Sequence, residues 1–386
     1  MTKFFGLTGL LLCTAMPAFA FEDGKILIWT GANRDKAALE AAVKPFTEEY
    51  GIDVSVEVVD PDLAQKFQQA ASTGDGPDIV MWAHDRFGEW ASGGLIRPVQ
   101  PSAEWSGGVL ASAMDAVRFD NVTWGYPVSV EAVHLIYNTD LIETAPSSFE
   151  DLIAMSYDGQ KILWDYNNAY FTMPLLMANG GFAFQKVDGS YDGSKTGVNN
   201  EGAIKGATML KRLIDEGVMP SGVDYGVMDG AMNKGEVAMV LNGPWAWPSL
   251  TESGINFGVA PIPSVDGAVS TPFLGVLAMA VNATTPNADL AVELLENYLL
   301  TDEGLATWNA TGALGALADV SAAAAQDDPH VSGMLKTAET AVPMPSNPEM
   351  GAYWAAMAPA LTNITTGAQD PATALNDAAA RILGGN

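Results

Sequence analysis

The hydrophobic positions near the start of the chain repeat a strand-then-helix pattern. Residues 25–30, KILIWT, form the short β-rich run of a buried strand. Apolar residues at helical spacing follow over 39–50, where Pro45 indicates a kink or a late start. Residues 53–59 and 78–82 predict two further strands, with an amphipathic helix between them. Repeated strand–helix units predict a parallel sheet covered by helices on both faces.

A second set of strands and helices fills the rest of the chain. Residues 124–130 and 132–138 have the pattern of strands, and we expect the chain to pass there from one domain to the other. The apolar run at 273–282 predicts a strand that returns the chain to the first domain. Residues 201–217 and 287–304 each predict one helix. At 386 residues the chain exceeds the size of one ordinary core. We therefore expect two α/β lobes joined by more than one crossing of the chain.

The first twenty residues have the features of a secretory signal peptide. Lys3 provides a basic start, the apolar run over 4–16 is too short to span a bilayer, and Ala18 and Ala20 occupy the small-residue positions of a cleavage site. The single cysteine, Cys13, lies inside this segment and is not placed for lipid modification. We expect cleavage after Ala20 and export of a cysteine-free protein.

Acidic residues dominate the exported part of the chain. The full sequence has 46 acidic and 18 basic residues and a formal net charge of −28, and the predicted signal peptide contributes only one basic residue to it. Such a surface repels nucleic acid and anionic lipid, so we expect no nucleic-acid partner. Solubility or adaptation to salt explains the acidity equally well, and it therefore indicates no partner by itself.

One stretch, GDGPDIVMWAHDRFG at 74–88, places an aromatic residue and an opposite-charge pair at the end of a predicted strand. In open α/β sheets ligands bind at the carboxyl ends of the strands, which makes Trp82, Asp85 and Arg86 candidates for a site. The alternative is that Trp82 belongs to the core and that Asp85 and Arg86 form a solvated pair at a helix start. This segment alone favours neither interpretation.

Three other clusters combine aromatic rings with polar side chains. They lie at 167–174, 242–248 and 350–357, and we expect them in loops that follow strands. A sugar stacks its C–H faces on aromatic rings, and its hydroxyl groups need both donors and acceptors. Four such clusters together indicate a carbohydrate site, although each by itself is more often packing. The three additional clusters contain Asn167, Asn168, Tyr170, Phe171, Trp245, Trp247, Tyr353 and Trp354.

Signatures of catalysis are mostly missing from the sequence. Neither a glycine-rich phosphate loop nor the G-x-S-x-G elbow of hydrolases occurs. The histidines, His84, His134 and His330, are scattered without a metal-binding spacing, so we expect no metal and no cofactor. A glycosidase needs only two suitably separated carboxylates, and the composition leaves a binding protein and a carbohydrate enzyme both open.

Four long segments, which follow one another in the chain, are GDGPDIVMWAHDRFG, YPVSVEAVHLIYN, NKGEVAMVLNGPWAW and LAVELLENYLLTDEGL. They carry a resemblance, in the same order and over essentially the whole exported chain, to the periplasmic maltose/maltodextrin-binding proteins of ABC importers, members of extracellular solute-binding protein family 1. It implies an α/β, two-lobed periplasmic-binding-protein fold with a hinged interdomain ligand cleft. The implied amino-terminal lobe is 21–129 plus about 279–323, the carboxy-terminal lobe is about 133–273 plus 325–386, and the hinge lies near 129–132 and 273–278.

The resemblance also implies the residues that contact the sugar. Asp85 and Arg86 would bond hydroxyl groups from the amino-terminal lobe, Glu131 would accept hydroxyl protons at the hinge, and aromatic rings of the other lobe would form a stacking platform. The implied ligand-binding residues are Asn33, Arg34, Trp82, Ala83, Asp85, Arg86, Glu131, Asn168, Tyr170, Phe171, Trp245, Met344 and Trp354.

Several positions depart from the family pattern at charged or polar contacts. The family's contact Asn, Asp and Lys after the first strand become Gly31, Asn33 and Arg34 here. Each lost charged hydrogen bond weakens binding by about tenfold or more if nothing replaces it. The stacking surface is kept while the hydroxyl contacts change, so the class of ligand is better supported than its identity. The remaining departures are Ala64, the pair Asn168 and Ala169, Ala355 and Ala358.

The function that the resemblance implies is a high-affinity receptor for an oligosaccharide of the maltose/maltodextrin type, which delivers the sugar to an ABC transporter by hinge closure. The departures leave another di- or oligosaccharide, such as trehalose, as a first alternative ligand. The alternative function is that of an exported carbohydrate-active enzyme that uses Asp85 and Glu131. We expect a monomer in the periplasm, with the membrane permease as partner and a chemoreceptor as a further candidate.

Overall fold

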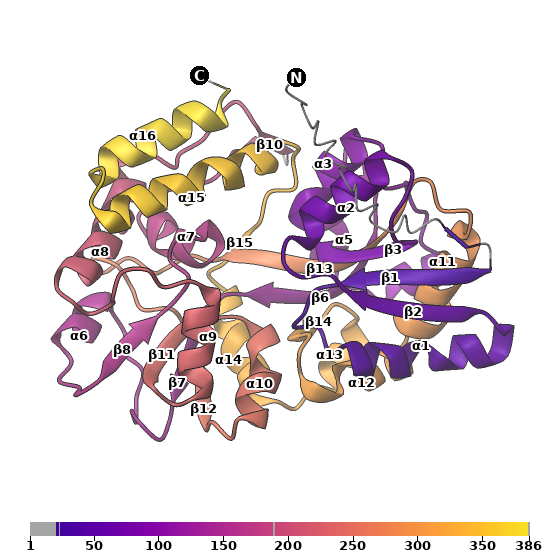
Figure 1. Ribbon diagram of the computed structural model, residues 1–386, viewed down its shortest axis with the longest axis horizontal. Helices are drawn as coiled ribbons and strands as arrows, with labels where there is room; N and C mark the ends of the chain where they lie inside the picture. The colour runs from indigo at the N-terminus through magenta and orange to yellow at the C-terminus, as the bar shows by residue number, and fades with distance from the viewer. Residues whose placement is uncertain (1–20, 23, 188–189, 385–386) are drawn as a thin grey trace, which may run out of the picture.

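The computed structural model of the protein describes residues 21–22, 24–187 and 190–384. The predicted signal peptide, with Cys13 and the cleavage point after Ala20, lies outside the described residues. Two halves lie side by side, each built around its own β-sheet (Figure 1). We call the half with the larger sheet the amino-terminal lobe and the half with the four-stranded sheet the carboxy-terminal lobe. The predicted α/β class and two-lobed architecture are confirmed.

The sheet of the amino-terminal lobe is mixed, so the predicted all-parallel sheet is wrong in part. Strands β2, β1 and β3 are parallel neighbours, as predicted, but β13 is antiparallel to both β3 and β6. The reason is that the chain leaves this lobe after β6 and returns as β13 in the opposite direction. The order is β14-β6-β13-β3-β1-β2, with β1 Lys25–Thr30, β2 Asp53–Val58, β3 Ile79–Ala83, β6 Tyr126–Ala132, β13 Phe273–Val281, β14 Ala316–Leu317, and β15 Val342–Pro343 paired with β13.

Helices pack against both faces of this sheet, and each face has its own hydrophobic core. One core contains Phe46 and Trp308, and the other contains Phe67 and Trp90. Over the described ranges, a helix with the length and apolar character needed to span a bilayer is not found. The helices are α1 Lys36–Tyr50, α2 Leu63–Ser72, η1 His84–Arg86, α3 Phe87–Ser92, α4 Ala103–Gly107, α5 Ala111–Ala116, α11 Ala288–Leu294, η3 Leu295–Leu299, α12 Asp302–Trp308, η4 Asn309–Thr311 and α13 Val320–Ala324, with a small hairpin of β4 Arg118–Phe119 and β5 Val122–Thr123.

Two helix predictions need correction. The late start indicated by Pro45 is wrong, because α1 begins at Lys36 and continues through the proline; Ala41, four residues earlier, is exposed, so its free carbonyl can bond to water. The single helix predicted over 287–304 is broken into α11, η3 and α12. The hydroxyl of Thr301 accepts from the Gly304 N–H at 3.2 Å and begins a new helix there.

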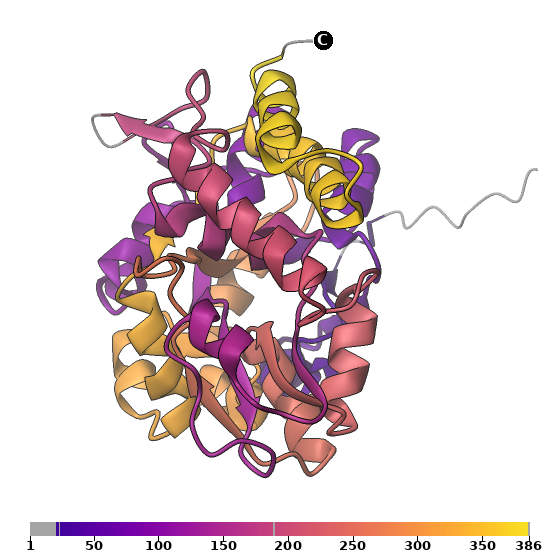
Figure 2. The same ribbon diagram turned by 90° about the vertical axis from the view of Figure 1, so that its left-hand side faces the viewer.

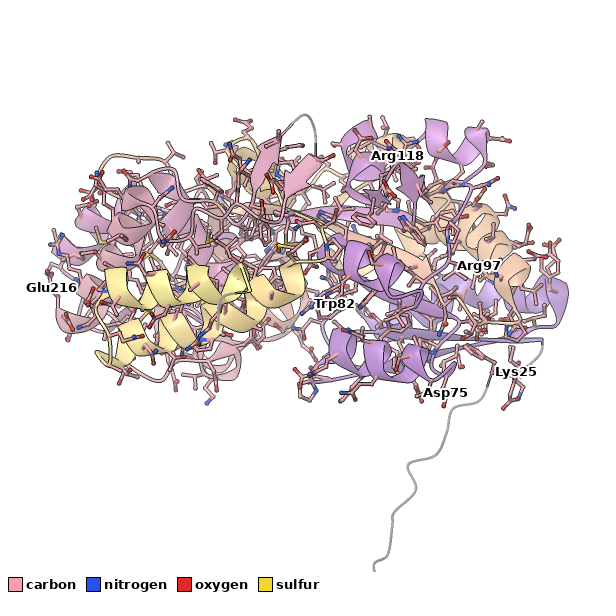
Figure 3. The ribbon with its side chains drawn as sticks, turned by 90° about the horizontal axis from the view of Figure 1, so that it is seen from above. Lys25, Asp75, Trp82, Arg97, Arg118 and Glu216 are labelled. Carbon is pink, nitrogen blue, oxygen red and sulfur yellow. The ribbon has the colours of Figure 1, made fainter. Side chains whose placement is uncertain are left out.

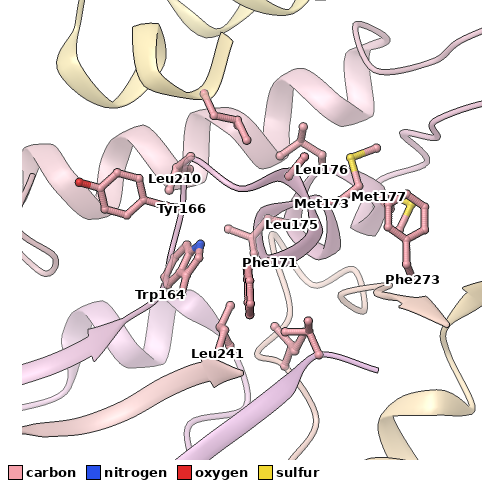
Figure 4. Packing of buried hydrophobic residues seen from close by; sticks show 14 of the residues in the cluster. Trp164, Tyr166, Phe171, Met173, Leu175, Leu176, Met177, Leu210, Leu241 and Phe273 are labelled. Carbon is pink, nitrogen blue, oxygen red and sulfur yellow. The ribbon is translucent and has the colours of Figure 1, made fainter. Parts of the chain in front are cut away.

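The carboxy-terminal lobe has a smaller sheet and a large helical layer. Its strands follow the order β12-β7-β11-β8, with β8 parallel to β11 and β7 antiparallel to β11 and β12. Trp164, Phe171, Leu210 and Phe273 meet in its core (Figure 4), and α15, α16 and α8 pack together at one side (Figure 2). The elements are β7 His134–Asn138, α6 Phe149–Ala154, β8 Gln160–Leu163, α7 Ala169–Ala178, β9 Gln185–Val187, β10 Ser190–Asp192, α8 Glu201–Asp215, α9 Tyr225–Asn233, β11 Val237–Asn242, η2 Pro244–Ala246, α10 Trp247–Glu252, β12 Phe257–Ala260, α14 Pro329–Ala338, α15 Met350–Thr366 and α16 Pro371–Ile382.

The strands β6 and β13 lie side by side where the two lobes meet (Figure 1). Their register places Ala132 opposite Leu274, Glu131 opposite Gly275 and Ser129 opposite Leu277. Both segments that we predict as hinge, 129–132 and 273–278, therefore belong to one antiparallel pair. The chain passes the same region again at β15, which pairs with the first residues of β13. Movement about this pair, and the lobe boundaries given above, stay predictions.

Helices α7 and α8 approach closely because glycines on α8 face the backbone of α7. A Cβ built at Gly206 would lie 2.1 Å from the carbonyl oxygen of Leu175, and one at Gly202 would lie 1.9 Å from that of Asn179. Such distances are far inside van der Waals contact, so any larger side chain must push the helices apart. This contact holds α7, whose first turn faces the space between the lobes.

Replacing Gly206 by Ala should destabilise the protein, although Ala is the better helix former by about 1 kcal/mol. We expect the free energy of unfolding, measured by urea denaturation, to fall by roughly 1–3 kcal/mol because α8 must move away from α7. The matched control is Gly230→Ala in α9, where a Cβ meets nothing within 4 Å; it should raise that free energy by up to about 1 kcal/mol. Equal effects of the two substitutions would contradict the close packing.

Candidate functional site

A cavity of about 490 Å³ lies between the lobes. Trp82, one of its residues, lies at the boundary between the two halves (Figure 3). All thirteen residues that the resemblance implies as sugar contacts line this one space. The lining consists of Gly31, Ala32, Asn33, Arg34, Asp60, Trp82, Ala83, Asp85, Arg86, Glu131, Asn168, Tyr170, Phe171, Tyr225, Trp245, Met344 and Trp354.

The amino-terminal lobe supplies residues from the carboxyl ends of two parallel strands. Asn33 and Arg34 follow β1, and Trp82 and Ala83 are the last residues of β3. Asp35 caps α1 by accepting from the Ala38 N–H at 3.0 Å, which holds the loop before it. The strand ends that the sequence indicated as a ligand-binding edge therefore do face the cavity.

The carboxy-terminal lobe supplies aromatic rings from three separate elements. Tyr170 and Phe171 lie in the first turn of α7, where Asn168 caps the helix by accepting from the Tyr170 N–H at 3.0 Å. Trp245 lies in η2, directly after β11. Trp354 lies in the helix α15. The expectation that the clusters form loops after strands is therefore wrong for Trp354, and also for Tyr170 and Phe171 in α7.

Three rings of this lobe, those of Tyr170, Phe171 and Trp245, form one connected surface. Centroids of Tyr170 and Trp245 are 6.2 Å apart with planes at 41°, and those of Phe171 and Trp245 are 6.3 Å apart and nearly perpendicular. Tyr170, Trp245 and Trp354 are partly exposed and leave ring surface toward the cavity. Trp82 is likewise only partly buried, so its assignment to the core alone is wrong. Such faces suit the C–H surface of a flat, hydroxylated ligand.

Both arginines that line the cavity are paired with carboxylates. Nη1 and Nη2 of Arg34 donate to the carboxylate of Glu131, with Nη2 3.0 Å from Oε2, and the Cζ of Arg34 lies 5.6 Å from the centroid of the Trp245 ring. Arg86 donates to Oε2 of Glu89 at 2.8 Å. Two-point pairing and stacking hold the Arg34 guanidinium in one orientation, so its remaining N–H groups are available in fixed directions.

Asp85 is a buried carboxylate rather than half of a solvated pair, so that alternative is wrong. Its side chain is 6% exposed, and Oδ2 accepts from the indole Nε1–H of Trp354 at 2.9 Å. Burial raises the pKa of the Asp85 carboxyl from its usual 3.8 to about 6, against the opposing effects of Arg86 and the Trp354 N–H. A carboxylate held this way is a strong acceptor for a hydroxyl donor that enters the cavity.

His84, next to Asp85, has a positioning role that the sequence did not reveal. Its Nδ1 accepts from the Val276 N–H at 3.0 Å, so Nε2 carries the proton and donates to the Met344 carbonyl at 2.9 Å. Burial lowers the pKa of His84 to about 4, and the ring is neutral at physiological pH. The imidazole thereby ties η1 to β13 and to the segment that carries Met344.

Several residues were missed or misplaced by sequence reasoning. Tyr225 and Asp60 line the cavity, but each stands in a segment without a neighbouring aromatic cluster that would have pointed to it. Trp247 and Tyr353, which stand beside or near lining residues in the chain, are buried in the core. Among the departures from the family pattern, Ala64, Ala169, Ala355 and Ala358 do not belong to the lining.

A larger hollow of about 740 Å³ lies on the amino-terminal lobe, around α4, α5 and the β4–β5 hairpin. Its lining contains none of the aromatic side chains that mark the cavity between the lobes. Volume alone would favour this hollow, but residue chemistry favours the interlobe cavity, where rings, carboxylates and guanidinium groups converge.

The sequence is similar to a family of binding proteins and to several of its members. Residues 41–333 match a family model described as bacterial extracellular solute-binding protein. The chain is 28% identical to the galactooligosaccharide-binding protein of Bacillus subtilis (strain 168), covering 94% of this chain and 90% of that protein. It is 27% identical to the maltodextrin-binding protein MdxE of the same organism, with 96% and 92% covered, and 27% identical to the maltotriose-binding protein of Pyrococcus abyssi (strain GE5 / Orsay), with 89% and 78% covered.

Replacing Asp85 by Asn should stabilise the protein at neutral pH but not at acid pH. A carboxyl whose pKa rises on folding from 3.8 to about 6 contributes its stabilisation fully below 3.8 and loses it as the pH rises through about 6. The amide still accepts from Trp354 but never ionises, so the variant avoids that loss. We expect its free energy of unfolding to exceed that of the unaltered protein by at most about 3 kcal/mol at pH 8.

Denaturant titrations at a series of pH values measure this difference, which should shrink below pH 4. The control is Asp53→Asn at an exposed position of β2, which should change the free energy of unfolding little at any pH. A stability difference for Asp85→Asn that is the same at pH 4 and pH 8 would rule out the buried charge as its cause.

Proposed function

This chain belongs to the bacterial extracellular solute-binding proteins, a family of receptors and not of enzymes, and from that premise we propose that it is an oligosaccharide receptor of an ABC importer. The observation that carries the proposal is the interlobe cavity, where aromatic rings from both lobes surround the carboxylates of Asp85 and Glu131. A carbohydrate-active enzyme based on these two carboxylates is not proposed, because the family assignment accounts for the chain as a binding protein.

The cavity has the groups that a sugar requires. A pyranose ring has two apolar C–H faces that stack on aromatic side chains, and a rim of hydroxyl groups that donate and accept hydrogen bonds. Trp82 from one lobe and Trp245 from the other supply stacking faces, Asp85 supplies acceptors, and Arg34 supplies donors. Groups from both lobes would contact one ligand, so binding would favour the arrangement in which the lobes are close together.

The proposed ligand is an oligosaccharide of the maltose/maltodextrin type. Support comes from the resemblance in the WAHDR segment at 82–86 and from similar proteins whose names specify maltodextrin and maltotriose. Another similar protein is named for galactooligosaccharides, at comparable identity. A galactooligosaccharide, or a disaccharide such as trehalose, is therefore the second candidate for the same site.

The proposed cycle is capture outside the cytoplasm followed by delivery. We propose that the mature protein works in the periplasm as a monomer and that the lobes close about the paired strands β6 and β13. The closed receptor would then dock on the permease of the importer, whose ATP hydrolysis drives uptake on the other side of the membrane. A chemoreceptor as a second partner stays a prediction.

Isothermal titration calorimetry against a panel of sugars tests the ligand. We expect micromolar or tighter binding of maltotriose, with weaker binding of a galactooligosaccharide and of trehalose. Tight binding of either of the other two, with no heat from any α-glucan, would replace maltodextrin by that sugar. Failure of every oligosaccharide to bind would overturn the proposed function.

Alanine variants of the aromatic residues test the site. Trp82→Ala and Trp245→Ala should each weaken binding of the best sugar by roughly 10- to 100-fold, because a stacking face and its buried apolar area are lost. Tyr50→Ala, at an exposed aromatic residue of α1 outside the cavity, is the control and should leave affinity unchanged. Unchanged affinity in both tryptophan variants would show that the sugar binds elsewhere.

A further inference from the structure

Two hydrogen bonds join side chains of the two lobes that both line the cavity, and each links residues far apart in the chain. Nδ2 of Asn33 donates to the hydroxyl of Tyr225 at 3.1 Å. Nε1 of Trp354 donates to Oδ2 of Asp85 at 2.9 Å. Asn33 and Asp85 belong to the amino-terminal lobe, and their partners belong to the carboxy-terminal lobe. Each pair therefore bridges the space that a ligand would occupy.

The two bridges lie at opposite ends of the cavity. Tyr225 begins α9, and Trp354 lies near the start of α15; these helices lie on opposite sides of the level of β6 and β13 in Figure 1. The Tyr225 ring adjoins Phe171, with centroids 6.1 Å apart. The Trp354 ring instead adjoins Tyr353 and Phe273, at 4.7 Å and 6.1 Å.

The Asn33 end is closed by more than one contact. Arg34, the next residue, is fixed by Glu131 on one side and by the ring of Trp245 on the other. Its side chain is 15% exposed, so a fixed and largely buried residue stands next to Asn33 in the chain. Asn33 itself is exposed, and its bond to the Tyr225 hydroxyl is a neutral one at the outer rim.

The two bridges differ in how readily they can open. The Trp354–Asp85 bond has a carboxylate acceptor and is largely buried, whereas the Asn33–Tyr225 bond joins neutral groups near solvent. A ligand that must break a neutral exposed hydrogen bond has its association constant lowered by about 3- to 10-fold, and breaking a charge-assisted buried bond lowers it by more. A chain too long for the cavity would therefore leave it past Asn33 and Tyr225.

We propose that Asn33 and Tyr225 form an interlobe clasp that limits ligand length, so that di- and trisaccharides bind better than longer chains of the same linkage. The inference rests on the proposed function. A cavity of about 490 Å³ lies in the lower part of the ~300–1,000 Å³ range of ligand sites, as expected for a short ligand. A longer chain fits only with the clasp broken, whereas a short one leaves it intact.

A clasp that limits length differs measurably from one that only helps the lobes close. If the bond only favoured closure, its removal would lower the affinity for oligosaccharides of every length by the same factor. If it limits length, its removal changes the ratio between the affinities of long and short chains. The ratio of the dissociation constant of the longest chain that binds to that of the trisaccharide therefore distinguishes the two roles.

The test is calorimetric titration of the whole exported protein with maltose through maltoheptaose, and with β-galactooligosaccharides of two to five units. For the unaltered protein we expect the dissociation constant to rise by about 3- to 10-fold from the trisaccharide to the longest chain of the series that binds, because that chain must break the clasp. In Tyr225→Phe and in Asn33→Ala that rise should fall to about twofold or less. The matched control, Tyr137→Phe in β7 outside the cavity, should keep the unaltered ratio.

Three results would overturn the clasp. In the first, the dissociation constants of the unaltered protein differ by less than threefold along the series. In the second, Tyr225→Phe and Asn33→Ala both melt at the temperature of the unaltered protein and both keep its length ratio. In either case oligosaccharide binding, and with it the proposed function, stands. Absence of binding at any chain length overturns both together.

Discussion

The antiparallel pairing of β6 with β13 is the contact on which the rest of this structure depends. The two strands are buried along almost their whole length, so their backbone N–H and C=O groups must bond to one another rather than to water. A shift of one residue would turn every side chain to the opposite face, and the register is therefore strongly specified. In that register Glu131 lies opposite Gly275 at the junction of the lobes.

The cavity is assembled outward from this pair. Glu131 on β6 orients Arg34, and the backbone of β13 orients His84 through Val276. His84 in turn bonds the carbonyl of Met344, whose own N–H donates to Leu274 on β13. Segments from three distant parts of the chain, at Arg34, His84 and Met344, thus reach one space because each bonds to one of these two strands. Burial keeps His84 neutral, so this connection does not depend on physiological changes of pH.

Prediction from sequence succeeded where the signal was local. The strand β1 and the strand end with Trp82 follow from apolar runs of five or six residues, since a buried strand leaves that pattern whatever surrounds it. The aromatic clusters were found, but their composition could not say which ring faces the cavity. Neighbours on a helix point about 100° apart, so Trp354 lines the cavity while Tyr353 is buried in the core.

By itself the sequence determined the α/β class, the strand ends that carry the candidate site and, through its family resemblance, thirteen of the seventeen residues that line it. Tertiary structure alone decided the antiparallel place of β13, the burial of Asp85 and the position of Tyr225 opposite Asn33. The physical reason is distance along the chain. Asn33 and Tyr225 are 192 residues apart and Asp85 and Trp354 are 269, so neither contact leaves a periodicity or composition that a local pattern can reveal.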